Sequence, residues 1–422
     1  MLTAKQIVAR RIRNNVIFPV ILFFFLTIGN YSFFRYSIYG IENVPVYLKL
    51  APYIRLFIPA WIIGYCLRIN PKLTSRILTD NFDIVLLGIS WMISSLLSLD
   101  VASYLFYGTW TLFSLMSILL FISYSSIISG TKSEFLLTTL NVLWAGNFVI
   151  LILDIATIIF MKPHGGMYQI IFSSNTFWAY PTMVLGILAV LKMRFTTESL
   201  FKKVYFLCIF LVCVVTVYFS ARRSPLFALI LASILIFIPP KTPQILIITS
   251  LFIFFYILLS SSTGEKVIKS LPDSYMKYRI ERMSGLIKGR KETSYSERQK
   301  IWKIYLNRFY EKPVFGEGLA SAQRINSVRT DNREGISAHN TFIGLLAETG
   351  LSGAFLMLVV LGRNFYFLVK TVNAKWIKIY IILFIPTLII NWVEYNLIPG
   401  QIFFLYTMVI WIMPRGLQNL SR

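Results

Sequence analysis

The sequence predicts an all-α polytopic membrane protein with about twelve transmembrane helices and a large helical loop on the outer side, before the tenth span. Three observations predict this class: an apolar composition, repeated long uncharged runs, and basic residues that gather in alternate loops. Of the 422 residues, 56% are apolar and only 14% are charged, and the mean hydropathy is +0.68. A soluble domain of this length could not hide so much apolar surface.

Apolar runs long enough to cross a bilayer recur along the whole chain. The expected spans are 15–34, 47–67, 83–99, 103–128, 135–161, 176–192, 204–220, 225–238, 244–260, 341–361, 377–393 and 401–413. The pair 83–99 and 103–128 can also be divided differently. The basic N-terminus leads into the first run without a small-residue cleavage site, so we expect a retained helix rather than a removed signal peptide. All three cysteines fall inside these spans, which is typical of small buried residues and not of a disulfide framework or a metal site.

The orientation follows from the short loops. If the spans are counted in this order, the basic loops all fall on one side of the membrane. Their basic residues are Lys5, Arg10, Arg11, Arg13, Arg68, Lys72, Arg76, Lys192, Arg194, Lys202, Lys203, Arg363, Lys370, Lys375 and Lys378. By the positive-inside rule this side is the cytoplasm, and both termini are expected there.

One long polar segment divides the chain into three parts: spans one to nine in 1–260, an outer loop in 261–340, and spans ten to twelve in 341–422. The loop carries sixteen Lys and Arg against nine Asp and Glu, a net charge of +7. Long loops cross the membrane largely regardless of charge, so the topology stands. The excess of positive charge indicates a solvated face, attraction to anionic lipid headgroups, or an anion-binding chamber over the membrane.

The outer loop is predicted to be structured. The stretch "YSERQKIWKIYLNRFYEK" repeats apolar residues at helical spacing and so predicts an amphipathic helix that Pro313 ends. The following "VFGEGLASAQRI" predicts a glycine-containing turn and a second short helix. A structured loop of this size favours a functional role over a simple connection.

Three arginines on the outer side are candidates for binding an anion. Arg222 and Arg223 fall in the tight turn between the seventh and eighth spans, where they are either membrane anchors or a fork of donors for phosphate oxygens. Arg298 falls in the first turns of the amphipathic helix, where a cation opposes the helix dipole. This placement indicates an external anion, unless Glu297 pairs with a neighbouring base.

His339 is one of only two histidines in the chain, and it stands where the polar loop enters the apolar run "HNTFIGLLAETGLSG". At such a boundary an imidazole can exchange protons near neutral pH, although an isolated interfacial histidine is often an ordinary polar residue. The other histidine, His164, is interpreted as an ordinary residue of a second outer loop.

The combined pattern resembles the O-antigen ligase and polymerase family of bacterial envelope polysaccharide assembly. The family's C-terminal signature is a histidine, then Asn, Ser or Gln, nine residues, and Gly-x-x-Gly, Thr or Tyr. It is matched by His339, Asn340, Gly350 and Gly353. The family's arginine-bearing helix and Pro-x-x-Gly-x-Gly turn are matched by Arg298, Trp302, Pro313, Gly316 and Gly318. The direct resemblance covers residues 294–356, and the layout of spans extends it to the whole chain.

The resemblance implies a metal-independent inverting glycosyltransferase of the bacterial inner membrane, with its active site on the periplasmic face and no cofactor. The donor would be a glycan on undecaprenyl diphosphate, and the acceptor another glycan or lipid A core. A chain-length regulator is a further partner within this class, whereas no nucleic acid is expected. Carried over by residue, Arg298 and Arg223 or Arg222 would bind the diphosphate, His339 would act on the acceptor, and Asn340 would contact substrate.

Within the family we favour a polymerase of O-antigen or a related surface polysaccharide; the alternative is a ligase that attaches the finished polymer to lipid A core. A lipid-linked glycan flippase is a less favoured class, because it predicts paired repeats and small outer loops. Arg55 and Asp154, which are charges within predicted spans, are the features that fit such a pathway.

Overall fold

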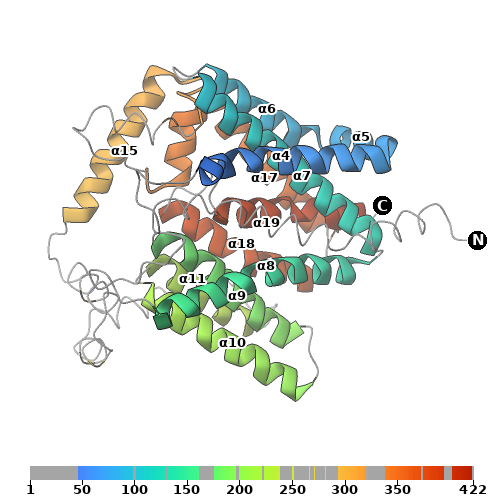
Figure 1. Cartoon of the computed structure of the whole chain (residues 1–422), viewed down its shortest axis with the longest axis vertical. Helices are drawn as coiled ribbons and strands as arrows, with labels where there is room; N and C mark the ends of the chain where they lie inside the picture. The colour runs from blue at the N-terminus through green and yellow to red at the C-terminus, as the bar shows by residue number, and fades with distance from the viewer. Residues whose placement is uncertain are drawn as a thin grey trace, which may run out of the picture.

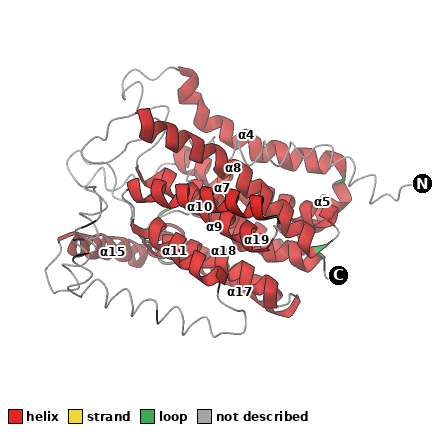
Figure 2. Cartoon of the chain, turned by 90° about the horizontal axis from the view of Figure 1, so that it is seen from below, coloured by secondary structure: helices red, strands yellow, loops and turns green. Residues whose placement is uncertain are grey.

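The computed structural model describes residues 46–97, 101–129, 131–160, 175–195, 199–220, 223–237, 250, 266, 270, 281, 293–319, 321, 338–371, 374–393 and 402–420. Within these residues all regular structure is helical, as the sequence predicts (Figures 1 and 2). The helices are α4 (Val46–Ile69), α5 (Pro71–Asp80), α6 (Phe82–Leu96), α7 (Val101–Ser129), α8 (Lys132–Phe160), α9 (Asn175–Phe195), α10 (Leu200–Phe219), α11 (Arg223–Phe237), α15 (Thr293–Glu311), α17 (Thr341–Thr371), α18 (Ala374–Val393) and α19 (Ile402–Asn419).

Helices occupy ten of the twelve expected spans; 15–34 lies outside the described residues, as does 244–260 apart from residue 250. In the described part, three helices are long and apolar enough to cross a membrane by themselves: Gly108–Ser129, Leu200–Phe219 and Thr341–Lys370. The bent pair α5 and α6 passes the same test when taken together. The chain is therefore a membrane protein, and the number of about twelve spans remains a prediction.

The helix α5 is an addition to the predicted layout. Asn70 caps its first turn by accepting a hydrogen bond from Leu73 N (3.0 Å), and Pro71 occupies its first position. It turns by 77° into α6 at Asn81, whose side-chain amide donates to Ile77 O (2.8 Å) and is satisfied within the turn. The sequence alone indicated only a basic loop at this place.

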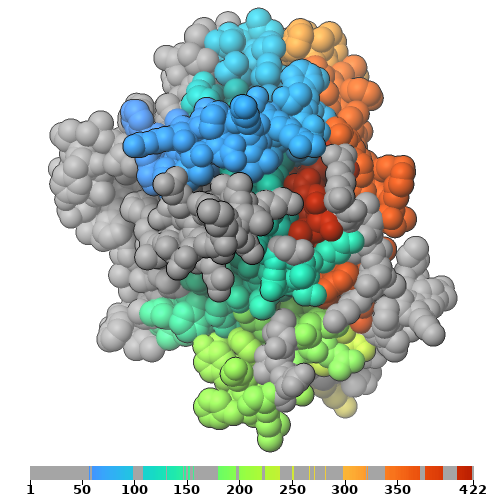
Figure 3. All heavy atoms as spheres, turned by 90° about the vertical axis from the view of Figure 1, so that its right-hand side faces the viewer, coloured from blue at the N-terminus to red at the C-terminus, as the bar shows by residue number. Residues whose placement is uncertain are grey.

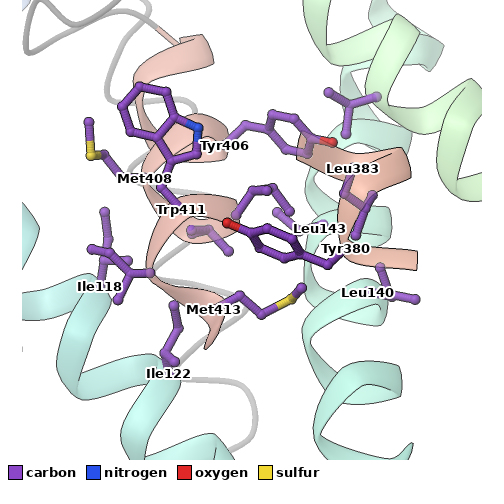
Figure 4. Packing of buried hydrophobic residues seen from close by; sticks show 14 of the residues in the cluster. Ile118, Ile122, Leu140, Leu143, Tyr380, Leu383, Tyr406, Met408, Trp411 and Met413 are labelled. Atoms are coloured by element: carbon purple, nitrogen blue, oxygen red, sulfur yellow. The ribbon is translucent and has the colours of Figure 1, made fainter. Parts of the chain in front are cut away.

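The long helices lie side by side and bury a large apolar core (Figure 4). In the region drawn, Trp411 and Met413 of α19 pack among Ile118 and Ile122 of α7, with Tyr380 of α18 beside them. The helix α10 is the exception, because only 22% of the residues in its apolar stretch are buried. It forms the light-green projection at the bottom of Figure 3 and exposes residues such as Phe201 and Val215 (82% and 53%). We infer that α10 faces lipid.

The predicted amphipathic helix of the outer loop is present as α15. It lies at the end of the bundle where α17 begins, while α5 and the C-terminus lie at the opposite end (Figure 1). This arrangement places the two segments of the family-like motif, residues 298–318 and 339–353, at the same end of the molecule.

Candidate active site

The helix α17 is broken at Gly350, which has φ 63° and ψ −164°. The sequence predicts a span over 341–361, and the structure has a helix there, but that helix is interrupted at this residue. A helix broken in this way leaves carbonyl oxygens before the break and N–H groups after it without helical partners. The turn that follows α15 supplies those partners.

Residues 313–318 and 347–352 pair through their backbones, and we call this pairing the glycine clasp. Four hydrogen bonds make it: Glu317 N to Ala347 O (3.0 Å), Gly318 N to Glu348 O (2.8 Å), Leu351 N to Pro313 O (2.8 Å) and Ser352 N to Val314 O (3.0 Å). The clasp uses both sides of the break in α17. It joins the Pro-x-x-Gly-x-Gly turn directly to the Gly-x-x-Gly segment.

The close approach of two backbones explains the glycines at the centre of the clasp. A Cβ atom on Gly316 would lie 2.4 Å from the carbonyl carbon of Glu348, and one on Gly350 would lie 2.5 Å from that of Val314. Both residues also have positive φ, at 67° and 63°. Only glycine fits such a conformation without strain.

The helix α6 supports the clasp from below. The hydroxyl of Ser94 lies 2.6 Å from the carbonyl oxygen of Phe315 and 2.6 Å from that of Glu348. Ser94 is fully buried, so this contact satisfies its hydroxyl away from water. The one hydroxyl hydrogen can be donated to either carbonyl oxygen, so Ser94 holds the clasp against the bundle through one of its two segments at a time.

The buried face of α15 attaches to the residue before His339. The indole of Trp302 donates a hydrogen bond to Ala338 O (2.8 Å). One turn further along α15, Tyr305 is fully buried and packs with Ala338 and Ala347. Burial raises the pKa of the Tyr305 hydroxyl, and the negative charge of Glu348 raises it further, so this group stays neutral.

Arg308 lies on the same face of α15, one further turn along, and its side chain is only 3% exposed. Its Nη1 lies 3.8 Å from Oε2 of Glu317, which belongs to the glycine clasp. Its three guanidinium nitrogens make no hydrogen bond to any described residue. The ion pair with Glu317 therefore compensates the buried charge and ties α15 to the turn that enters the clasp.

His339 itself has φ 47°, a left-handed conformation that is uncommon outside glycine. The next residue, Asn340, is buried and caps α17, because its side-chain oxygen accepts from Phe342 N (2.9 Å) and Ile343 N (3.0 Å). This capping is the role that the structure gives to Asn340, while its predicted contact with substrate remains a prediction. His339 stays half-buried between two buried neighbours.

Arg298 is half-buried and lies one helical turn before Trp302 on α15. Residues four apart share a face of a helix, so Arg298 is on the side of α15 that approaches Ala338 and His339. The structure therefore brings the helix of Arg298 to the predicted histidine.

The second predicted arginine is not placed in the same way. Arg223 begins α11, but its side chain lies outside the described residues, and so do Arg222, His164 and most of the loop 261–292. The side chains of Arg55 and Asp154 are also outside this part. The convergence of Arg222 or Arg223 with His339 remains a prediction. Among the described residues no cluster of three His, Cys, Asp or Glu could hold a metal.

Sequence reasoning missed several groups that build this site. Arg308 and Glu317 were counted only as loop charges, yet both join α15 to the clasp. The spacing of Trp302, Tyr305 and Arg308 at three-residue intervals was the available signal for one buried face. Asn391, which contacts Thr341 at the start of α17, carried no recognisable signal in the sequence.

Comparison with known proteins identifies the part of the chain that contains this site. Residues 208–358 match a family model described as O-antigen ligase. The matched segment includes α11, α15, the glycine clasp and the first half of α17. This match confirms the resemblance that the motif around His339 indicates. No curated protein matches the chain.

Proposed function

We propose that the protein transfers a glycan from undecaprenyl diphosphate to an acceptor sugar at the periplasmic face of the bacterial inner membrane, because residues 208–358 match a family model described as O-antigen ligase. Within this class we favour polymerisation of O-antigen or a related surface polysaccharide. The observation that supports the proposal most directly is His339 at the start of α17, next to the helix that carries Arg298.

In the proposed reaction His339 takes the proton from the acceptor hydroxyl. The hydroxyl oxygen attacks the anomeric carbon of the donor sugar, the bond from that carbon to the phosphate oxygen breaks, and undecaprenyl diphosphate leaves. One direct displacement inverts the anomeric configuration. A positioned general base contributes on the order of 10²–10⁴-fold to the rate.

Arg298 and Arg223 are proposed to hold the diphosphate and to offset the charge that grows as it leaves. Arginine suits this role because its planar fork of donors matches phosphate oxygens. Preorganised donors of this kind contribute on the order of 10²–10³-fold each. Since the arginines supply the positive charge, we expect activity to persist in excess EDTA; complete loss restored by Mg²⁺ or Mn²⁺ would contradict this assignment.

The direct test uses purified protein in lipid nanodiscs with a lipid-diphosphate glycan and an acceptor. We expect His339→Ala to lose nearly all transfer, and Arg298→Ala to weaken use of the donor, with Arg298→Lys restoring only part. Lys303→Ala is a matched control, because Lys303 is an exposed cation on the same helix. Wild-type transfer by His339→Ala, with the protein folded, would refute the proposed function.

A ligase is the second candidate, since the matching family model is described as O-antigen ligase. Surface glycans of a deletion strain distinguish the two. Caps of a single repeat unit indicate a lost polymerase, whereas intact polymer that stays on the lipid carrier indicates a lost ligase.

A further inference from the structure

A buried hydrogen bond reaches the start of α17 from inside the bundle. The hydroxyl of Thr341 lies 2.9 Å from Oδ1 of Asn391 on α18, and both residues are fully buried. Thr341 is the first residue of α17 and stands two positions after His339. The bond therefore fixes α17 at the end where the proposed general base lies.

The neighbours of Asn391 determine which atom donates. The amide nitrogen of Asn391 lies 2.7 Å from Thr387 O, and a carbonyl oxygen can only accept. The same nitrogen lies 3.3 Å from the hydroxyl of Thr407 on α19. Both amide hydrogens are thus used, so Oδ1 must accept and the Thr341 hydroxyl must donate. The orientation of the amide is fixed by Thr387 of its own helix and by Thr407 of α19.

This anchor matters because His339 has a left-handed backbone. A non-glycine residue keeps such a conformation only where its surroundings hold it. On one side the Ala338 carbonyl is held by Trp302 (2.8 Å), and on the other Thr341 is held by Asn391. The backbone of His339 therefore lies between two residues that are held by different helices: Ala338 by α15 and Thr341 by α18.

We propose that Asn391 is a positioning residue for the proposed transfer: through Thr341 it sets the height and rotation of His339 at the mouth of the bundle. This inference rests on the proposed function. Displacement of a reacting group by about 1 Å can cost on the order of 10²-fold in rate. We therefore expect loss of the anchor to lower kcat more than it changes KM.

The test compares Thr341→Val, which keeps the shape and removes the hydroxyl, with Thr341→Ser, which keeps the hydroxyl. We expect kcat to fall by about tenfold or more in the valine variant, with KM little changed, and to be largely retained in the serine variant. Thr139→Val is the matched control, because Thr139 is also fully buried and its hydroxyl donates to Phe135 O of its own helix (3.0 Å), its one hydrogen bond within the described residues.

Two results would overturn the proposal: wild-type kcat in Thr341→Val, or an equal loss of kcat in Thr139→Val. If Thr341→Val does not accumulate in the membrane, Thr407→Val is used instead, because it removes only the longer contact to the amide. Its kcat must then fall below that of the Thr139→Val control, and an equal kcat would overturn the proposal. Active His339→Ala would instead refute the proposed function itself, so the two failures are distinguishable.

A different observation concerns the opposite end of the bundle, where α8, α9 and α18 leave a cavity of about 230 Å³. We call it the α8–α9–α18 groove. Its lining is apolar except for one serine: Ser133, Leu136, Leu137, Leu140, Leu191, Phe195, Trp376 and Ile379. Spans predicted from the sequence put these helix ends on the cytoplasmic side.

The groove has positive charge beside it. Arg194 is exposed and lies three residues after Leu191, which lines the groove, so these two residues share a face of α9. Arg194 also interacts electrostatically with Lys378 of α18, whose amine donates to Ile236 O (3.0 Å). Since Lys378 is buried and donates to a carbonyl oxygen, the cation exposed beside the groove is Arg194. An exposed cation near an apolar cavity complements a negatively charged headgroup with a hydrocarbon tail.

We infer that the α8–α9–α18 groove binds an acyl chain of an anionic phospholipid whose phosphate contacts Arg194. The occupant is a membrane lipid and not the glycan donor, because the groove lies at the end opposite His339. This inference does not depend on the proposed function.

The test adds either phosphatidylglycerol or phosphatidylcholine to the delipidated protein. Native mass spectrometry then counts the lipid molecules that each protein molecule retains. We expect selective retention of phosphatidylglycerol, weakened about fivefold in Arg194→Gln, the effect of about one charge near a membrane surface. Arg76→Gln is the control, because Arg76 is an exposed cation that pairs with Asp80 (3.7 Å). Equal retention of the two lipids, or no difference between the two variants, would refute the inference.

Discussion

The end of the bundle that carries His339 and the end that carries Asp83 are closed by different kinds of interaction. At the first, the glycine clasp pairs backbone with backbone, and Ser94 of α6 supports it. At the second, Asp83 at the start of the same helix accepts from Arg363 of α17 (2.9 Å) and from Arg415 of α19. The helix α6 thus contacts α17 at both of its ends.

The difference has a consequence for which side chains each end can offer. At the Asp83 end the charged side chains pair with one another. Arg415 is only 1% exposed, pairs with Asp83 and also donates a hydrogen bond to Asn364. The clasp itself is made by main-chain atoms, and His339 and Arg298 beside it are half-buried. At the clasp end the main chain makes most of the contact between the two segments, with one ion pair, Arg308–Glu317, beside it; at the Asp83 end the contact between helices is made by charged side chains.

Gly350→Ala should have the largest effect, because the new Cβ would lie 2.5 Å from Val314 and the backbone conformation favours glycine. We expect a loss of about 4 kcal/mol in the free energy of unfolding, with almost no activity. A Cβ atom on Gly362 of the same helix would have no described neighbour within 4 Å, so Gly362→Ala should leave the free energy of unfolding unchanged. Thermal unfolding in nanodiscs checks both, and equal melting temperatures would mean that the clasp does not hold α17.

Asp83→Asn should come next, because it leaves Arg415 buried without a carboxylate. Breaking such a pair costs about 3 kcal/mol. Since the change is far from His339, the molecules that remain folded should keep their kcat. Asp80→Asn is the control: Asp80 pairs with exposed Arg76, and its loss should cost at most about 1 kcal/mol. A large fall in kcat per folded Asp83→Asn molecule would show that the two ends are coupled.

Glu317→Gln should destabilise less, by about 1–2 kcal/mol, since the pair with Arg308 is 3.8 Å long and lacks hydrogen bonds. Because α15 would no longer be tied to the clasp by this ion pair, we expect the variant to use its donor less well even where it remains folded. The readout is the KM for the lipid-linked donor, which Arg298 is proposed to bind. Glu311→Gln, an exposed carboxylate at the end of α15, should change neither quantity.

Trp302→Phe should give the smallest effect. It keeps an aromatic ring but removes the N–H that donates to Ala338 O, at a cost of about 0.5–1.5 kcal/mol. We expect a several-fold lower kcat with a melting temperature close to that of the wild type. Trp61→Phe, at a position that is 57% exposed, serves as the comparison. Unchanged kcat in Trp302→Phe would remove Trp302 from the supports of His339.

The positions of the helices could be predicted from the sequence, because each long apolar run needs internal backbone hydrogen bonds in a membrane. The break at Gly350 could not, since a single glycine in an apolar run is also common in unbroken membrane helices. The helix α17 continues to Thr371, ten residues beyond its predicted end, because Arg363 and Asn364 find partners in Asp83 and Trp411. Those partners are distant in sequence and leave no local pattern.

At the site, the sequence indicated the types of residue more reliably than their supports. His339, Arg298 and the glycines follow a motif with fixed spacing. Arg308 resembled a solvated charge, and its burial depends on Glu317 and on the packing of α15 against α17. Asn391 resembled any polar residue near the end of a span. Such contacts depend on tertiary structure and could not be predicted without it.

The glycine clasp also bears on how this end of the protein can be exchanged between relatives. Its hydrogen bonds are made by main-chain atoms, so the side chains at Val314, Phe315 and Leu351 do not determine the pairing. A chimera that imports α15 and its following turn from another family member should dock on this α17 wherever the glycines are kept. Exchange of α15 and the turn that follows it would then be enough to transfer a substrate preference between relatives, and the membrane helices would not need to be redesigned.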